Sequence, residues 1–369
     1  MSKLLDFFKL QNVPINEIEC GLYTSHNLLY DDIPYRLHLR VEHNQTGVLT
    51  LNASTVLHLN KTAMEMAYFL IQGQNPLEIA NTISLRYKAP KDEIIQDVES
   101  FYTTLMSFVN NQDLPPTGFL GVIQNFEESE IIAPYRLDCY FSQNEKSTLL
   151  SISEWKVIFE KVYNAGIPHI ILLNVDFLTK SDLFELLTHL EDLGLVSGLV
   201  TTPSFLENAN MLEEILNRGL DHIILDADPT NKSHLLKTIE ILNQDLYTCL
   251  RMPVHENHDY KSIIEKLFDA GINAIAFSKD SNSFSPTFIN LEQIIIKKQI
   301  PIIDDMPFSN PAEDYTFNKL HYSKSKLKYL KLFSNSELII PGSTPISIGN
   351  LLLEPWDKLW TKCRQFSDG

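Results

Sequence analysis

The sequence contains no apolar run of the roughly 18 residues that a membrane-spanning helix needs. Its first residues, Met1–Asp6, lack the basic and apolar regions of a secretory signal peptide. We therefore expect a cytoplasmic protein that has no membrane partner.

Cysteine is scarce, and the chain of 369 residues has only Cys20, Cys139, Cys249 and Cys363. No two of them have the spacing of a metal-binding or redox motif. We expect reduced, mostly buried thiols and no metal site.

Positive charge is also in deficit, because 30 Lys and Arg face 47 Asp and Glu and give a formal net charge of -17. A nucleic-acid backbone is held by clustered basic side chains, so the composition argues against nucleic acid as a partner. The chain also lacks a phosphate-binding loop with its lysine and a serine-nucleophile motif, which lowers the expectation of an enzyme.

A repeat is the most informative feature that the sequence does contain. Three segments, 164–171, 217–224 and 269–276, end a helical pattern with glycine and then begin a short apolar run. Glycine accepts the left-handed conformation that ends a helix, and a parallel strand buried on both faces is continuously apolar. With similar neighbouring segments, the pattern predicts six strand–helix units, with strands near 135–141, 168–173, 196–201, 221–226, 247–252 and 273–277. The expected fold is α/β, with a partial (β/α)6 TIM-like barrel.

Residues 35–60 have the alternating pattern of strands instead, which predicts short strands near 35–41, 48–51 and 55–59. Helical periodicity follows, over about 63–73, from Pro76 onward and over 91–109. A winged-helix-like α+β domain is therefore expected before the barrel.

Within this domain, residues 56–63 read Val-Leu-His-Leu-Asn-Lys-Thr-Ala and lead into a helix, Gly73 and a second helix. In that order, the region resembles the PqqD-like peptide chaperones, also called precursor-peptide recognition elements (RRE). The resemblance implies that the domain binds the leader segment of a ribosomally made precursor peptide as a strand added to an open sheet edge. The peptide-binding residues that it implies are Val56, Leu57, His58, Leu59 and Phe101. A winged-helix regulator is the alternative, but its basic recognition helix is missing.

Stretches of the second half match another family. Pro134–Cys139 matches the first strand, 171–178 the second strand and its loop, and 348–351 followed by 356–360 a motif near the C-terminus. At these positions the barrel resembles the radical S-adenosylmethionine (SAM) family, and the tail resembles that family's SPASM extension.

The departures from this family decide what the resemblance implies for function. Its cluster loop, Cys-x3-Cys-x2-Cys, would fall between Ser142 and Leu149, where the chain has no cysteine. An iron–sulfur cluster needs thiolates in close array. Where the family has Gly-Gly-Glu-Pro, the chain reads Asn-Val-Asp-Phe over 174–177, which adds side chains where close backbone approach needs glycine. We therefore expect no cofactor and no catalytic residue of that family.

Polar residues nevertheless follow the predicted strands. The candidate ligand residues of the barrel mouth are Asp176, Asp226, Asp228, Arg251 and His255. Because neighbouring parallel strands end at the same edge, we expect both Asp226 and Asp228 to face Arg251. A hydrated helix start is the alternative for the stretch around His255. His169 and His222, which begin buried strands, are expected at the edge of the core.

The expected organisation is an extension over 1–33, a peptide-binding domain over 34–110, a linker over 111–133, a barrel over 134–299 and a tail over 300–369. The favoured function is a cluster-less, non-redox pseudoenzyme that binds a precursor peptide and serves as scaffold or partner subunit for a modifying enzyme. The alternatives are an enzyme with cluster-independent chemistry at the barrel mouth, and the winged-helix regulator.

Overall fold

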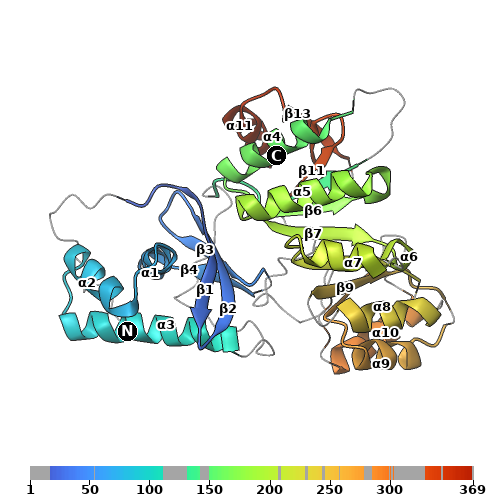
Figure 1. Cartoon of the computed structure of the whole chain (residues 1–369), viewed down its shortest axis with the longest axis horizontal. Helices are drawn as coiled ribbons and strands as arrows, with labels where there is room; N and C mark the ends of the chain where they lie inside the picture. The colour runs from blue at the N-terminus through green and yellow to red at the C-terminus, as the bar shows by residue number, and fades with distance from the viewer. Residues whose placement is uncertain are drawn as a thin grey trace. The chain divides into compact units, whose positions relative to one another are not determined.

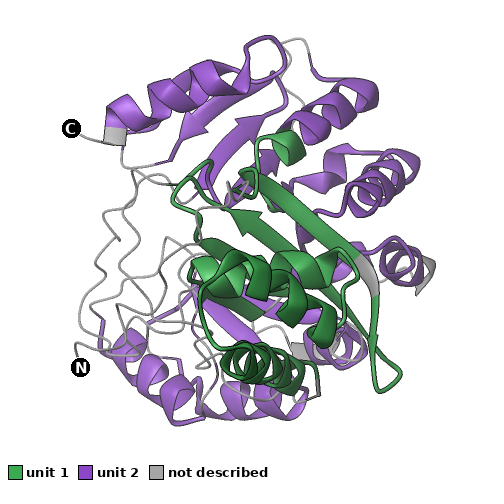
Figure 2. Ribbon diagram, turned by 90° about the vertical axis from the view of Figure 1, so that its left-hand side faces the viewer, with its two compact units in different colours: residues 1–133, 162–168, 310–324 green, residues 134–161, 169–309, 325–369 purple. Residues whose placement is uncertain are grey.

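The computed structural model describes residues 17–53, 55–110, 131–141, 149–206, 209–228, 232–242, 246–256, 258–277, 285–298, 300, 302, 329–341 and 344–367. The chain divides into two compact units (Figures 1 and 2). Unit 1 comprises 1–133, 162–168 and 310–324, and unit 2 comprises 134–161, 169–309 and 325–369. Within the described residues, no helix is long and apolar enough to cross a membrane.

Unit 1 contains a four-stranded antiparallel sheet in the order β1-β2-β3-β4. Its strands are β1 (Gly21–Tyr30), β2 (Ile33–Val41), β3 (Gly47–Leu51) and β4 (Thr55–Leu59). The last three are the predicted strands. The first lies in the stretch expected to be an extension over 1–33, so that expectation is corrected: part of this stretch belongs to the sheet.

The sequence pattern misses β1 for two physical reasons. A register shift between Ser25 and Leu28 interrupts the period-2 alternation of the strand. The hairpin turn consists of Asp31 and Asp32, which have φ values of 49° and 65°, instead of the Asn-Gly pair that most clearly signals such a turn.

Three helices follow the sheet, as predicted: α1 (Lys61–Ile71), α2 (Pro76–Arg86) and α3 (Lys91–Asn110). Figure 1 shows them gathered on one side of β1–β4. The side chain of Asn60 accepts a hydrogen bond from the amide of Ala63 and caps α1, while Asn75 and Glu78 form a capping box at α2. These helices bury one apolar cluster with the sheet, which includes Leu37, Leu39, Leu49, Leu57, Met64 and Leu105.

Unit 2 contains a nine-stranded sheet in the order β10-β9-β8-β7-β6-β5-β11-β12-β13. Its first six strands are the predicted ones and run parallel: β5 (Arg136–Tyr140), β6 (His169–Leu173), β7 (Val196–Thr201), β8 (His222–Asp226), β9 (Tyr247–Met252) and β10 (Ala274–Phe277). The helices between them are α4 (Ile152–Asn164), α5 (Lys180–Leu193), α6 (Pro203–Leu206), α7 (Ala209–Leu216), α8 (Lys232–Leu242) and α9 (Lys261–Asp269), and α10 (Pro286–Lys297) follows β10. The parallel α/β fold is confirmed, whereas its barrel form stays a prediction.

The strands of the expected tail extend the same sheet. They are β11 (Tyr329–Phe333), β12 (Glu337–Ile340) and β13 (Ile346–Asn350), and α11 (Trp356–Ser367) follows. β11 lies parallel to β5, and β12 and β13 continue antiparallel. Most of the linker expected over 111–133, and the tail segment 303–328, lie outside the described residues.

A lysine of α4 anchors the turn between β13 and α11. Lys161 donates hydrogen bonds from Nζ to the carbonyl oxygens of Leu351 (2.6 Å), Leu352 (3.0 Å) and Glu354 (3.1 Å). Partial burial lowers the pKa of Lys161. One ammonium group therefore satisfies three main-chain acceptors of the turn.

We expect Lys161→Met to lower the free energy of unfolding by about 2 kcal/mol, because three carbonyl groups lose a charged donor. Lys156→Met, on the same helix, is the matched control. Lys156 pairs with Glu185 at 2.6 Å, with side chains 31% and 51% exposed. An exposed pair of this kind contributes less than about 1 kcal/mol. Urea denaturation of both variants measures the difference, and equal midpoints would contradict the anchoring role.

Candidate functional site

The free edge of β4 is the first candidate site. Among the described strands, β4 neighbours only β3, with which it pairs continuously from Leu51↔Thr55 to Gly47↔Leu59. The strand reads Thr-Val-Leu-His-Leu and has no proline, lysine, carboxylate or bulge. The opposite edge strand, β1, is irregular because of its bulge. β4 is therefore the regular edge on which another strand can pair.

The five residues implied for peptide binding differ in their burial. Leu57 and Leu59 are each 2% exposed and Phe101 is 5% exposed, so these three side chains belong to the core of unit 1. Val56 and His58, which alternate with them along β4, are partly exposed. The main chain of β4 and the side chains of Val56 and His58 are therefore the groups that a docked strand can contact.

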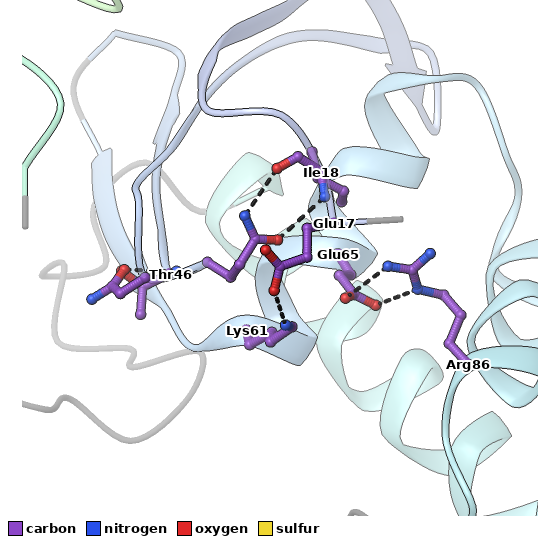
Figure 3. Close-up of polar contacts among 8 residues, drawn as sticks. Glu17, Ile18, Thr46, Lys61, Glu65 and Arg86 are labelled. Atoms are coloured by element: carbon purple, nitrogen blue, oxygen red, sulfur yellow. Dashed lines mark hydrogen bonds and ion pairs between the residues drawn. The ribbon is translucent and has the colours of Figure 1, made fainter. Parts of the chain in front are cut away.

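Polar contacts fix the chain next to the end of β4 (Figure 3). Lys61, the first residue of α1, lies 3.3 Å from a carboxylate oxygen of Glu17. The Gln45 side chain accepts a hydrogen bond from the Ile18 amide (3.2 Å) and donates one to the Ile18 carbonyl (2.9 Å). The segment that precedes β1 is thereby held close to the residues that follow β4.

A buried ion pair joins the first two helices below this segment. Arg86, at the end of α2, donates two hydrogen bonds of 2.9 and 3.1 Å to Glu65, whose side chain is 1% exposed (Figure 3). Burial, and then the Glu65 carboxylate, raise the pKa of Tyr87. The bidentate geometry offsets the desolvation of Glu65 and fixes α1 against α2.

The mouth of the parallel sheet in unit 2 is the second candidate site. Asp226 and Arg251 are register partners on β8 and β9, and Arg251 donates from Nε and Nη2 to the two carboxylate oxygens of Asp226. Asp228 accepts instead from His255, with 2.9 Å between Oδ2 and Nε2. The mouth therefore holds a pair of Asp226 with Arg251 and a pair of Asp228 with His255, whereas the expectation that Asp228 also faces Arg251 stays a prediction.

These pairs are only partly shielded from water. The side chains are 35% and 40% exposed for Arg251 and Asp226, and 45% and 40% for His255 and Asp228. The main-chain amide of His255 donates to the hydroxyl oxygen of Tyr260 at 2.8 Å, and burial raises the pKa of Tyr260. Asp176 lies exposed in a short 3-10 turn, η2 (Val175–Phe177), after β6, and β7 lies between β6 and β8 in the sheet.

Cys139, Cys249 and Cys363 are free and buried. Burial raises the pKa of Cys139 well above its ordinary value, and raises the pKa of Cys249 and Cys363 to about 12. Among the described residues, no group of three or more His, Cys, Asp or Glu side chains is arranged to hold a metal ion. The stretch 142–148, where a cluster loop would fall, lies outside the described residues and contains no cysteine.

Sequence reasoning missed a buried polar contact on one face of the parallel strands. His169 and His222 are 0% and 2% exposed, and their Nε2 atoms lie 3.1 Å apart. β6 and β8 are separated by β7, and the two rings meet above Gly198, which has no side chain. The available signal was the repeat itself, since each histidine opens the apolar run of its repeat.

An ion pair on β5 lies on the same face. Arg136 donates to Asp138 at 2.6 and 3.1 Å, and its guanidinium stacks over the Tyr329 ring at 4.4 Å. Both charged residues are 6% exposed. Burial, followed by the charge of Arg136, lowers the pKa of His222 to about 3.

We expect this histidine to make the stability of unit 2 depend on pH. The unfolded chain binds a proton at His222 below about pH 6.5, whereas the folded chain does not until about pH 3. The contribution of the neutral, buried His222 to stability is therefore complete above pH 6.5 and is lost as the pH falls toward 3. Between pH 7 and pH 4, the free energy of unfolding should fall by roughly 3 kcal/mol more in the parent than in His222→Gln. His258→Gln, at an exposed site, should retain the parent slope.

The comparisons with known proteins find similarity in structure but not in sequence. No family model and no curated protein matches the sequence. The Streptococcus suis SuiB structure bound to S-adenosylmethionine superposes with a TM-score of 0.54 at 11% identity, covering 91% of this chain and 88% of SuiB. SuiB bound to its precursor peptide SuiA gives a TM-score of 0.52 at 12% identity, covering 87% and 86%. The similarity supports the radical SAM-like fold expected from the sequence, and at this identity it shows the fold alone.

Proposed function

We propose that the protein binds a ribosomally made precursor peptide by strand addition to β4, and that it acts as a scaffold or partner subunit for the enzyme that modifies the peptide. The observation that carries the proposal is the β4 edge, which is regular and uncharged and which, in the part of unit 1 that the structure describes, is paired on one side only. Main-chain groups at such an edge provide affinity for an extended peptide, and the flanking side chains provide selectivity. Val56 and His58 would supply that selectivity.

The structural comparisons support a peptide as the ligand. SuiB, whose fold covers nearly the whole chain, has been solved with its precursor peptide SuiA bound. The acidic character of α3 disfavours the alternative of a winged-helix regulator. This helix begins Lys-Asp-Glu and also carries Asp97 and Glu99, so its charge would repel a phosphate backbone.

The proposal of a scaffold role depends on the side chains that unit 2 could offer as ligands to an iron–sulfur cluster. Cluster chemistry needs accessible thiolates, and the cysteines of its described part are buried thiols with raised pKa values. At the strand ends, Tyr140 stacks on Phe333 with ring centroids 5.1 Å apart, and the Lys331 ammonium lies over the Tyr140 ring. We expect protein treated anaerobically with iron and sulfide to retain no stoichiometric iron and to cleave no SAM.

Calorimetry tests the peptide site with synthetic peptides that match any short open reading frames found beside the gene. Val56→Lys places a charge on the docking edge and should weaken binding at least tenfold, because an edge lysine opposes strand addition. Thr24→Lys, on the opposite edge strand β1, is the matched control and should bind within twofold of the parent. Equal affinities for the two variants would place the peptide elsewhere.

A second candidate function is favoured by one contact, the 2.9 Å pair of Asp228 and His255 at the sheet mouth. A carboxylate that orients a histidine is the arrangement of a general base. If the pair is catalytic, Asp228→Asn should slow product formation at least a hundredfold in a reconstituted pathway and leave peptide affinity unchanged. The scaffold role predicts an unchanged rate, and Asp259→Asn in the following loop is the control.

A further inference from the structure

We infer that Lys331, held in place by Tyr140 and Phe333, binds the carboxylate group of a small apolar acid or of a peptide. Lys331 and Phe333 lie on β11 and Tyr140 lies on β5, and these two strands pair in parallel register. The site belongs to unit 2, whereas the β4 edge belongs to unit 1.

Charged and aromatic side chains line the seam between β5 and β11. The register partners on one face of this seam are Tyr329 and Arg136, Lys331 and Asp138, and Phe333 and Tyr140. They share a face because side chains two residues apart on a strand point to the same side. Parallel strands of an α/β sheet are normally apolar on both faces, so a row of this composition departs from what packing alone requires.

Lys331 carries a charge that the described residues do not neutralise. Asp138, its register partner, is held by Arg136 through hydrogen bonds of 2.6 and 3.1 Å. Glu337, the first residue of β12, accepts a hydrogen bond of 2.6 Å from the Ser347 hydroxyl. Among the side chains that the structure describes, no carboxylate forms an ion pair with Lys331.

A ring face holds the ammonium group in place. The Nζ atom of Lys331 lies over the Tyr140 ring, 5.2 Å from its centre. A ring face attracts an ammonium by its quadrupole but does not supply a strong hydrogen-bond acceptor. A carboxylate ligand would supply both the acceptor and the opposite charge, and such charge-assisted hydrogen bonds are the stronger kind.

The aromatic pair beside Lys331 is fixed by its neighbours and is only partly buried. Tyr140 and Phe333 stack with their ring centroids 5.1 Å apart and an interplanar angle of 22°. Tyr140 also packs against an apolar cluster that includes Leu173 and Val200. Both rings and Lys331 retain partial exposure, so a ligand can reach them. An apolar group attached to the carboxylate would pack against the exposed part of the Phe333 ring.

The charges on these strands favour a carboxylate over a phosphate. On the same face, Arg136 is already paired with Asp138, and Arg251 is paired with Asp226. Within the described strands of this face, Lys331 is therefore the one cation without a carboxylate partner. A single ammonium balances the one negative charge of a carboxylate, whereas the second charge of a phosphate dianion would be left unbalanced.

Ligand-observed NMR tests the site with 3-phenylpropionate and its uncharged amide, 3-phenylpropionamide. The intact chain should bind the acid with a millimolar or lower dissociation constant, and the amide at least tenfold more weakly, because only the acid offers a charge to Lys331. Lys331→Met keeps an apolar stem without the ammonium, and it should lose at least tenfold in affinity for the acid. Lys297→Met, which removes an exposed ammonium on α10, is the matched control and should bind the acid within twofold of the parent.

Equal affinities for the acid and the amide would overturn the inference, as would parent affinity for the acid in Lys331→Met. Failure of the intact chain to bind the acid would overturn it as well. Thermal unfolding of each variant shows that it is folded at the assay temperature. If Lys331→Met is not folded, Lys331→Gln provides the same test with a polar stem.

A second pair of ligands identifies the source of the carboxylate. A precursor peptide that binds in calorimetry is compared with the same peptide amidated at its C-terminus, and this arm alone rests on the proposed function. If amidation weakens binding at least fivefold in the parent but not in Lys331→Met, the peptide supplies the carboxylate. Equal affinities of the two peptides, together with binding of 3-phenylpropionate, assign the site to a free acid. Failure of every peptide to bind counts against the proposed function and leaves the test with 3-phenylpropionate unchanged.

Discussion

Gly198→Ala is expected to destabilise unit 2 by about 3 kcal/mol or more. A Cβ atom at residue 198 would lie 2.6 Å from Cε1 and 2.8 Å from Cδ2 of His222, and closer still to Nε2. Real Cβ atoms do not approach ring atoms so closely, so the histidine would have to move. It cannot move cheaply, because its ring is buried and contacts His169 at 3.1 Å.

A double-mutant cycle separates this steric clash from other effects. His222→Ala alone removes a buried ring and should cost about 2 to 3 kcal/mol through the cavity that it leaves. The double variant Gly198→Ala/His222→Ala should cost less than the sum of the two, because the new methyl group enters that cavity. Strictly additive effects would mean that residue 198 does not contact His222.

Gly73→Ala is the control for backbone strain without a clash. Gly73 has a φ of 84°, and an added Cβ there meets nothing within 4 Å. We expect a loss of about 1 kcal/mol at that site, from the left-handed conformation alone. Denaturation curves of the four variants and the parent measure these differences.

The contact between His169 and His222 shows where sequence reasoning stops. The repeat predicts both strands, because glycine at the helix ends and the continuous apolar runs are local signals. The meeting of the two rings depends on the side chain of a third strand: Gly198 on β7 leaves the gap through which they touch. Periodicity along one strand carries no information about such a gap.

At the mouth of the sheet, the sequence predicts one of the two side-chain pairs and not the other. Parallel order predicts that Asp226 and Arg251 end neighbouring strands, and the structure pairs them in register. The partner of Asp228 depends on the loop after β9, where the hydroxyl of Tyr260 accepts from the His255 amide and helps to place that residue. Loop geometry of this kind is set by tertiary contacts, which the sequence pattern does not reveal.

Glu42→Gln is expected to cost about 3 to 5 kcal/mol in the stability of unit 1, because it leaves a buried guanidinium without its counter-charge. The side chains of Arg40 and Glu42 are 1% and 0% exposed. Arg40 donates from Nε to Glu42 at 2.7 Å and from Nη1 to the Ala133 carbonyl at 3.0 Å, and Glu42 accepts from the Ile132 amide at 2.8 Å. The pair thus joins β2 to residues 131–133 of the same unit.

The matched variants distinguish a buried charge from a lost hydrogen bond. Glu17→Gln, in the exposed pair with Lys61, should change the free energy of unfolding by less than about 1 kcal/mol. Arg40→Met combined with Glu42→Gln removes both charges. We expect this double variant to recover a large part of the free energy of unfolding that Glu42→Gln loses, because only neutral groups then lack a hydrogen-bond partner. If the double variant is instead the less stable of the two, the hydrogen bonds to Ile132 and Ala133, and not the balance of charge, hold this junction together.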